Sequence, residues 1–442
     1  MELPRSILAC LKRLEDAGFA CYAVGGCVRD WLLGKSCSDY DLCTAATPEQ
    51  IKALFFDHNL VLAGEKHGTV GIVTDCGVVE ITTFRTEGGY LDNRHPDWVR
   101  FVDRIEDDLS RRDFTVNAMA WSPIRGLCDP FGGRSDLEKG ILRCVGDPET
   151  RFREDALRIL RGVRFAVRFR LIPEASTLSA MDSLSPLMEN LARERVFSEL
   201  SKLLTGITAD ELLRFRTPVT QSMPELAATV DFCQHSPHHA YDVYTHTAHV
   251  TAAVPGKPAL RWAALLHDIG KVPTFRADEN GRGHFYGHAE KSAEMADAIL
   301  LRLKAPTALR EQVVALIGLH MAPVPSEKKT LRRWLGRYGR ELLEDLLTLQ
   351  EADGSSKGVG EPVDTAHFAR VRQLLDAIEA ENSCLKVADL AVNGHDLAAL
   401  GYQGKAIGDA LNLLLEQVLD EKLPNEKPAL LDALKETNII WR

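Results

Sequence analysis

The change in hydrophobic pattern near residue 145 constrains the fold of this 442-residue chain more than any other feature. Before it, short apolar runs predict strands at Cys21–Val24 and in a hairpin made of Thr69–Thr74 and Val78–Phe84. After it, apolar residues recur at helical spacing, interrupted by proline and glycine. The pattern therefore predicts a mixed α/β head followed by an all-α remainder, with about two to four compact units.

Two glycines at a predicted strand-to-helix turn precede a pair of aspartates. Gly25 and Gly26 let the backbone approach a phosphate, and the helix that follows offers N–H donors. Further along, Asp39 and Asp41 alternate on an expected strand, so both carboxylates point to the same side. An Asp-x-Asp alone is usually a solvated turn, but after a phosphate-binding turn it predicts catalytic Mg²⁺ ligands for nucleotidyl transfer.

Two nearby residues extend this prediction. Arg29 can add a bidentate contact to a phosphate oxygen. Glu80, on the second strand of the predicted hairpin, is either a third carboxylate of the site or an exposed strand residue, and the sequence leaves both interpretations open.

Five motifs in order carry a resemblance to a known family. The glycine turn and the Asp-x-Asp are similar to the head of the nucleotidyltransferase superfamily that includes DNA polymerase β. The next four motifs resemble those of class II CCA-adding tRNA nucleotidyltransferases, and they occupy residues 108–120, 129–137, 151–161 and 193–200. Residues 389–397 also match, so the resemblance covers most of the chain.

The resemblance implies that the chain adds and repairs the 3′-terminal CCA of tRNA from CTP and ATP without a nucleic-acid template, by two-metal transfer. It implies a DNA polymerase β-like α/β head at residues 1–145, an all-α neck with the nucleotide-selecting helix at 146–227, a metal-binding HD module at 228–360 and a tRNA-binding tail at 361–442. The nucleotide-binding residues that it implies are Gly26, Arg29, Arg112, Asp155, Arg158, Arg161 and Arg164.

The arginine-rich segment at residues 152–168 suggests how side chains would select a base. Its periodicity predicts one amphipathic helix with an arginine face, which on an ordinary surface helix would merely be solvated. Asp155 and Arg158, three residues apart, can project side by side. The carboxylate would accept from the amino group of C or A, and the guanidinium would donate to the adjacent ring nitrogen, whereas U and G present the opposite polarity.

Histidines and aspartates in the helical part predict a second metal site. A lone histidine is more often a hydrogen-bonded structural residue, but six residues follow the order seen in HD phosphohydrolases: His246, His267, Asp268, His288, His320 and Asp353. These donors suit Ni²⁺, Mn²⁺, Co²⁺ or Zn²⁺, and a bound metal would activate water against a phosphoester. His284 is a candidate for binding the phosphate. The sequence does not decide which metal binds or whether the module is active.

The amino-acid composition limits which partners and which location the chain can have. The net charge of −10 argues against a wholly basic nucleic-acid surface, but residues 151–170 hold seven arginines against two acidic residues, which is compatible with tRNA. No apolar run is long enough to span a membrane, and no signal peptide precedes the head. Ten cysteines without a Cys-x-x-Cys pair read as reduced thiols of a cytoplasmic protein.

Three alternatives remain open. A bacterial poly(A) polymerase would share the head, although such enzymes usually carry a basic tail and this C-terminus is acidic. A CC-only or A-only adding enzyme is also possible, but the Gly-rich segment 86–96 resembles a full-length flexible loop, which CC-adding members shorten. The third is an HD phosphohydrolase with a nucleotide-sensing head. The sequence indicates no oligomeric state.

Overall fold

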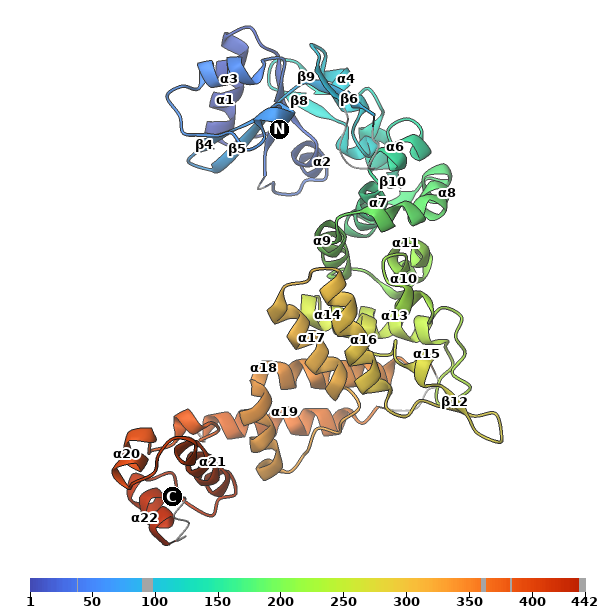
Figure 1. Ribbon diagram of the computed structural model, residues 1–442. Coiled ribbons are helices and arrows are strands. Elements are labelled where there is room, and N and C mark those ends of the chain that lie inside the picture. Colours follow the sequence, from blue (N-terminus) through green and yellow to red (C-terminus); the bar gives the residue numbers. More distant parts are fainter. Residues whose placement is uncertain (38, 90–97, 359–362, 382–383, 437–442) are drawn as a thin grey trace. The chain divides into compact units, whose positions relative to one another are not determined.

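The computed structural model describes the chain except for residues 38, 90–97, 359–362, 382–383 and 437–442 (Figure 1). The predicted flexible loop at 86–96 therefore lies largely outside the described residues. The chain divides into two compact units. The first comprises residues 1–227 and 302–305, and the second comprises 228–301 and 306–442.

A seven-stranded mixed sheet forms the core of the first unit, in the order β3-β4-β5-β2-β1-β8-β9. The neighbouring strands β2 and β5 pair in parallel, and the other neighbours pair antiparallel. The strands are β1 (Cys21–Val24), β2 (Asp41–Thr44), β3 (Leu60–Val61), β4 (Thr69–Thr74), β5 (Gly77–Thr83), β8 (Ala120–Ser122) and β9 (Gly126–Cys128). The predicted strand at Cys21–Val24 and the predicted hairpin are thus confirmed.

Helices cover this sheet because their apolar residues recur every three or four positions. Ile7, Leu11 and Leu14 of α1 (Arg5–Asp16) are buried in one apolar core with strand residues such as Ile81. The remaining elements of the head are α2 (Gly26–Leu32), α3 (Pro48–Leu54), the hairpin β6 (Arg85–Gly88) and β7 (Trp98–Phe101), α4 (Ile105–Ser110), α5 (Gly133–Glu138) and β10 (Ile141–Leu142).

Helices dominate the rest of the first unit, and one prediction there is wrong. The expected continuous helix at 152–168 is broken, because α6 ends at Glu154, Asp155 is extended (φ −141, ψ 103) and α7 begins at Leu157. The Asp155 carboxylate accepts from the backbone N–H of Leu157 at 3.0 Å, which stabilises the break. The elements are α6 (Pro148–Glu154), α7 (Leu157–Phe169), β11 (Ile172–Pro173), α8 (Ala175–Leu184), α9 (Arg193–Leu204), α10 (Ala209–Arg214), α11 (Arg216–Thr220) and α12 (Pro224–Ala227).

The described residues of the second unit form helices apart from one short hairpin (Figure 1). Its first elements are α13 (Val243–Ala253), α14 (Pro258–Leu266), α15 (Lys271–Thr274), β12 (Arg276–Ala277), β13 (Gly283–His284) and α16 (His288–Arg302). They are followed by α17 (Thr307–Leu319), α18 (Lys328–Ser355, kinked at Gly339), α19 (Thr365–Ala380), α20 (Gly394–Ala399), α21 (Lys405–Leu419) and α22 (Lys427–Glu436). The last three helices share an apolar core that includes Leu397, Leu414 and Leu430.

The prediction of an all-α remainder holds for the long elements. β11 to β13 are two residues each and make two-residue ladders, too short for a periodicity of two to show in the sequence. Within the described part of the chain, no helix is long and apolar enough to cross a membrane.

Candidate functional site

The glycine turn lies beside the first residue of β2. The register of β1 on β2 pairs Val24 with Asp41, so Gly25 follows directly at the edge where Asp41 begins its strand. Gly25 has a left-handed backbone (φ 71), and a Cβ atom there would lie 2.8 Å from Nη1 of Arg112. Glycine is therefore required at this position for two reasons: it adopts the left-handed backbone of the turn, and it leaves room for the close approach of Arg112.

Arg29 on α2 is held in place within the head. Its guanidinium donates to Asn117 Oδ1 at 2.5 Å and to Asp30 Oδ1 at 2.8 Å, and it lies 4.1 Å from the ring centroid of Phe169. The residue is buried, and this burial lowers the pKa of Arg29 although Asp30 opposes the shift. The side chain is thus fixed before any ligand binds.

The predicted head carboxylates lie at the start of β2. Asp39 precedes the strand and Asp41 opens it, and both are in contact with solvent. The pKa of Asp41 is raised to about 6, because surrounding protein atoms desolvate the carboxylate and Asp39 and Glu80 add negative charge, while Arg112 opposes the shift. A divalent cation would relieve this repulsion. Glu80 is exposed on β5.

One cavity of about 480 Å³ brings most of the predicted head residues together. Its walls come from the glycine turn, Asp41, the segment after α4 and the arginine face of α7. The predicted residues that line it are Gly26, Arg29, Asp41, Arg112, Asp155, Arg158, Arg161 and Arg164. Phe165 and the further arginines Arg111, Arg168 and Arg195 complete a lining that suits a polyanion with a planar ring.

Asp155 and Arg158 both line this cavity, but each is bound to other side chains. Arg158 donates to Glu154 Oε2 at 2.7 Å and to the carbonyl oxygen of Arg111 at 3.0 Å. Asp155 accepts from Arg195 Nη2 at 2.8 Å. The sequence alone assigned no role to Glu154 and Arg195. They hold the two candidate base-reading groups in fixed orientations.

Arginines of the cavity are supported by buried aspartates. Asp113 accepts from Arg161 at 2.7 and 2.9 Å and from Asn117 Nδ2 at 3.1 Å. Burial would raise the pKa of Asp113, but Arg161 and the hydrogen bonds outweigh it and hold the pKa at about 2. The carboxylate is therefore ionised at neutral pH and connects the head segment of Asn117 to α7.

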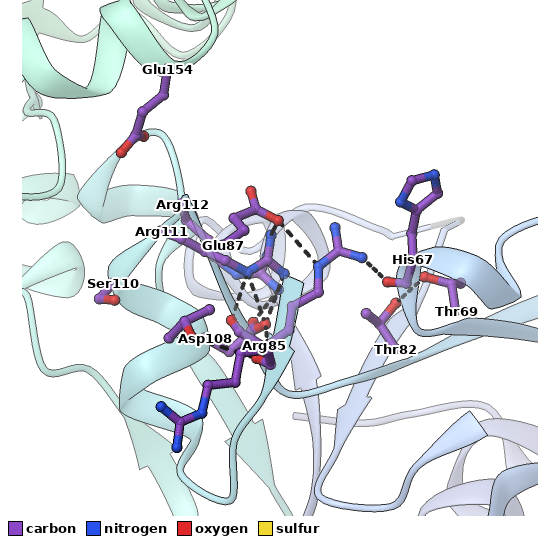
Figure 2. Close-up of polar contacts among 12 residues, drawn as sticks. His67, Thr69, Thr82, Arg85, Glu87, Asp108, Ser110, Arg111, Arg112 and Glu154 are labelled. Atoms are coloured by element: carbon purple, nitrogen blue, oxygen red, sulfur yellow. Dashed lines mark hydrogen bonds and ion pairs between the residues drawn. The ribbon is translucent and has the colours of Figure 1, made fainter. Parts of the chain in front are cut away.

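Asp108 forms a second support, shown in Figure 2. Its carboxylate is fully buried, and it accepts from Arg111 at 2.8 Å, from Arg112 at 3.4 Å and from the backbone N–H of Arg85 at 3.2 Å. Burial raises its pKa, but the two arginines overcome this effect and the pKa of Asp108 is lowered. Glu87 lies 3.3 Å from both Arg85 and Arg111, so this network joins the β6–β7 hairpin to the cavity.

The second unit brings all six predicted HD residues together. Asp268 lies between the histidines: its Oδ2 is 3.5 Å from His246 Nε2 and 3.2 Å from His267 Nε2. Its Oδ1 is 3.5 Å from His288 Nε2 and 4.0 Å from His320 Nε2. Asp353 Oδ1 is 3.0 Å from His246 Nε2. In the described part of the chain, groups of three candidate ligands occur at His246, His267 and Asp268, and at Asp268, His288 and His320.

The four histidines share one orientation, which prepares them as ligands. Each Nδ1 lies within hydrogen-bond distance of a backbone carbonyl oxygen, at 3.2, 2.8, 2.9 and 2.7 Å for His246, His267, His288 and His320. Each Nε2 is buried without a hydrogen-bond partner among the described residues. A proton on Nδ1 leaves the Nε2 lone pair facing the carboxylates, as metal coordination requires.

Charge in this cluster also suits a cation. Burial would raise the pKa of Asp268 and Asp353, but the neighbouring histidines, and for Asp268 also Lys271, hold both pKa values below the usual range. Burial lowers the pKa of His320 to about 4 and also lowers that of His288. The pKa of His267 is raised, because Asp268 outweighs burial. Two carboxylates therefore stay ionised beside the neutral imidazoles of His288 and His320.

Three family profiles match the chain in the order of these elements. Residues 21–143 match the profile described as Poly A polymerase head domain. Residues 171–214 match a probable RNA- and SrmB-binding site of polymerase A, and residues 238–357 match the HD domain.

Full-length relatives carry a more specific name. The chain is 49% identical to a CCA-adding enzyme of Streptococcus pyogenes over 412 residues, which is 93% of this chain and 90% of that enzyme. The Bacillus stearothermophilus CCA-adding enzyme, solved in complex with CTP, is 29% identical with a TM-score of 0.73, and the match covers 99% of this chain and 98% of that one. The Thermotoga maritima CCA-adding enzyme, solved with tRNA, shares the fold at 20% identity and a TM-score of 0.58, over 99% and 97% of the two chains.

Proposed function

This chain belongs to the family of CCA-adding enzymes, and we propose on that basis that it builds and repairs the 3′-terminal CCA of tRNA from CTP and ATP. The observation that carries the proposal is the cavity of the first unit. There Asp41, a row of arginines and the pair Asp155 and Arg158 line one space.

The donor set of the head fits a divalent cation. Nucleotidyltransferases of this kind use divalent metal ions. Asp39 and Asp41 offer oxygens only, the ligands that Mg²⁺ prefers. Desolvation is the main cause of the raised pKa of Asp41, and the charge of Asp39, which a cation would balance, adds to it. Bound Mg²⁺ would lower the charge on the α-phosphate and orient the 3′-hydroxyl of the tRNA. Asp39 and Asp41 are the residues that would hold it.

The chain's own residues position the incoming nucleotide. Arg112, Arg161 and Arg164 contact the triphosphate or the ribose, and Arg29 stands at the phosphate turn. Asp113 and Glu199 orient two of these groups, since Glu199 accepts from Arg164 at 2.6 Å. Because the arginines are paired before the nucleotide arrives, little conformational entropy is lost on binding.

Base selection follows from polarity at Asp155 and Arg158. The Asp155 carboxylate accepts from the exocyclic amino group of C or A, and Arg158 donates to the neighbouring ring nitrogen. The ion pair of Arg158 with Glu154 presents the guanidinium in one orientation. Protein side chains thereby take the place of a nucleic-acid template.

The acceptor arm of tRNA is the proposed partner, gripped by the helical neck and tail through shape and phosphate contacts. The domain limits that we propose are 1–145 for the head, 146–227 for the neck, 228–360 for the HD module and 361–442 for the tail. A cytoplasmic location is supported by the ten cysteines, each of which is a free thiol.

In a direct test, the protein is incubated with tRNA that lacks its CCA and with labelled CTP or labelled ATP. We expect CTP to add two residues and ATP to add one only after CC is present. Long A tracts from ATP alone would indicate a poly(A) polymerase, and a product ending at CC would indicate a partial enzyme. No incorporation with Mg²⁺ would refute the proposal.

The HD cluster supports a second activity, a metal-dependent phosphohydrolase. The two oxygens of Asp268 face different histidine pairs, so Asp268 would hold a metal together with His246, His267, His288, His320 and Asp353. Imidazole-rich ligands favour Ni²⁺, Co²⁺, Zn²⁺ or Mn²⁺ over Mg²⁺. Such ions would supply an activated water to a phosphoester.

This second activity is tested with p-nitrophenyl phosphate and each of these metals. Release of p-nitrophenol that disappears in Asp268→Ala would support the activity. Absence of release with every metal would indicate that the cluster serves structure only.

A further inference from the structure

Among the large hydrophobic side chains that the structure describes in the second unit, that of Tyr286 is the most exposed, with 79% of its surface accessible, and it is near the HD cluster in the sequence. It is two residues before the ligand His288, so the two Cα atoms are at most about 7 Å apart. Exposure of one aromatic ring is common, but the support that this ring receives from its neighbours is specific.

One face of Tyr286 is stacked on His284. The two ring planes are 2° from parallel and their centroids are 5.5 Å apart, an offset stack. The hydroxyl group of Tyr286 lies 3.5 Å from His284 Nδ1. His284 Nε2 in turn lies 3.2 Å from Asp278 Oδ2, so this histidine faces a carboxylate.

His284 ends the second strand of a hairpin that is anchored to the segment Gln234–His235, and Tyr286 follows that strand. The β12–β13 hairpin projects from the helices of the second unit (Figure 1). Its turn is closed by Asp278, which accepts from the backbone N–H groups of Asn280 and Arg282, both at 2.9 Å. Gly283 donates to the carbonyl oxygen of His235 at 2.9 Å, and a Cβ atom there would lie 2.3 Å from the carbonyl oxygen of Gln234. The base of the hairpin therefore has little freedom.

Phe285 connects the stacked rings to the ligands. Its carbonyl oxygen lies 2.9 Å from Nδ1 of His288, and its ring packs on Phe275 with centroids 5.7 Å apart. Lys271, whose Nζ lies 2.8 Å from Asp268, is also 5.5 Å from the Phe285 ring. Phe285, whose carbonyl oxygen orients the ligand His288, thus lies between His284 and Tyr286 in the sequence and constrains the direction of both rings.

From this arrangement we propose that Tyr286, backed by His284, is a stacking platform for a nucleobase, and that the HD cluster acts on a phosphoester carried by a nucleotide. The proposal rests on the proposed phosphohydrolase activity and names its substrate class. Stacking uses the π face that every base offers, so the platform tolerates base identity. A nucleotide carries its base and its phosphate on one ribose, and Tyr286 precedes the ligand His288 by only two residues.

Two sources share this chemistry, a free nucleotide and an RNA end that carries a phosphate. Guanosine 3′-monophosphate is the probe, since the polarity of Asp155 and Arg158 disfavours guanine in the head cavity. Binding to the Mn²⁺-loaded full-length protein is measured by calorimetry, with ribose 5-phosphate as a ligand without a base. A short oligoribonucleotide ending in a 3′-phosphate forms the second arm.

Tyr286→Ala is expected to lower the ratio of affinities for guanosine 3′-monophosphate and ribose 5-phosphate by about tenfold, and Tyr286→Phe is expected to retain the ratio within about threefold. Leu400→Ala, at an exposed apolar position of the same unit, is the control and should retain it fully. Tighter binding of the oligoribonucleotide, with the same dependence on Tyr286, would assign the site to RNA ends, and equal binding would assign it to free nucleotides.

The inference is overturned if the ratio is unchanged in Tyr286→Ala, or if the wild-type protein binds ribose 5-phosphate and guanosine 3′-monophosphate equally or binds neither. Hydrolysis of p-nitrophenyl phosphate is measured in parallel on the wild type. If the wild type does not hydrolyse p-nitrophenyl phosphate but shows binding that depends on Tyr286, the proposed phosphohydrolase activity is refuted and a nucleotide-binding site remains. Failure of the phosphohydrolase and failure of the stacking platform can therefore be told apart.

Discussion

The substitution Asp155→Ala tests base selection most directly. It removes one acceptor for the amino group of C or A, while Arg158 keeps its ion pair with Glu154 at 2.7 Å. A bidentate contact to a base discriminates by about 1–3 kcal/mol, which corresponds to about 5- to 150-fold. We therefore expect the ratio of kcat/KM for CTP to that for UTP to fall by a factor in this range.

The side effect of the substitution is small enough for this comparison. Asp155 also accepts from the Leu157 N–H at the start of α7 and from Arg195. Loss of the cap costs about 1 kcal/mol and loss of the charged hydrogen bond about 1.5–3 kcal/mol, together below the stability of a folded domain. Asp147→Ala is the matched control, because Asp147 caps α6 by accepting from the Thr150 N–H at 2.9 Å and does not line the cavity. The assay is single-nucleotide addition to tRNA lacking its CCA.

Two outcomes would refute the reasoning. An unchanged CTP to UTP ratio in folded Asp155→Ala would move base selection to other residues of the cavity. An equal fall in Asp147→Ala would show that the stability of the helical segment, and not the carboxylate, controls the ratio.

Three further substitutions test the two sites. Asp41→Ala should reduce nucleotide addition by orders of magnitude with tRNA affinity nearly unchanged, as measured by filter binding, and normal turnover would contradict the metal assignment. Gly25→Ala should reduce kcat/KM for CTP about tenfold, since its Cβ would displace Arg112 and the left-handed backbone costs about 1–2 kcal/mol; Gly34→Ala has a similar φ of 67 with open space and should reproduce only the loss of stability. Asp268→Ala should abolish metal uptake, measured by mass spectrometry, and phosphoester hydrolysis while retaining CCA addition, and a folded variant that loses addition would show that the two sites are coupled.

The helical break at Asp155 shows what the sequence could not predict. Apolar residues such as Phe152, Ala156 and Leu160 keep helical spacing across it, so periodicity alone predicts one helix. The break depends on hydrogen bonds of the Asp155 side chain, and one of them comes from Arg195, 40 residues later. Tertiary contacts of this kind override a local pattern.

The candidate sites were predictable where side-chain type alone identifies the chemistry. The order and spacing of adjacent His267 and Asp268, and of Asp39 and Asp41 after a glycine turn, indicate candidate metal ligands. The supporting residues were missed for a common reason: Asp108, Glu154 and Arg195 act on other side chains, and their partners follow from the fold. The carbonyl groups that orient the histidines belong to the backbone, which is the same for every residue type, so the sequence does not identify them.

The orientation of those histidines leads to a final prediction, that metal binding and stability of the second unit are linked. A buried polar atom without a partner costs about 1–3 kcal/mol, and four Nε2 atoms of the cluster lack one within the described part of the chain. Ions that ligate these atoms bind the folded state better than the unfolded chain and so stabilise it. Chelation should lower the unfolding temperature in scanning calorimetry, and Ni²⁺ should restore it better than Mg²⁺, because imidazole nitrogens are poor ligands for Mg²⁺. Asp268→Ala, which removes the carboxylate that lies between the four histidines, should be insensitive to chelation. An identical thermogram after verified removal of metal would show that the cluster is satisfied without ions, and the Nε2 geometry would then need another explanation.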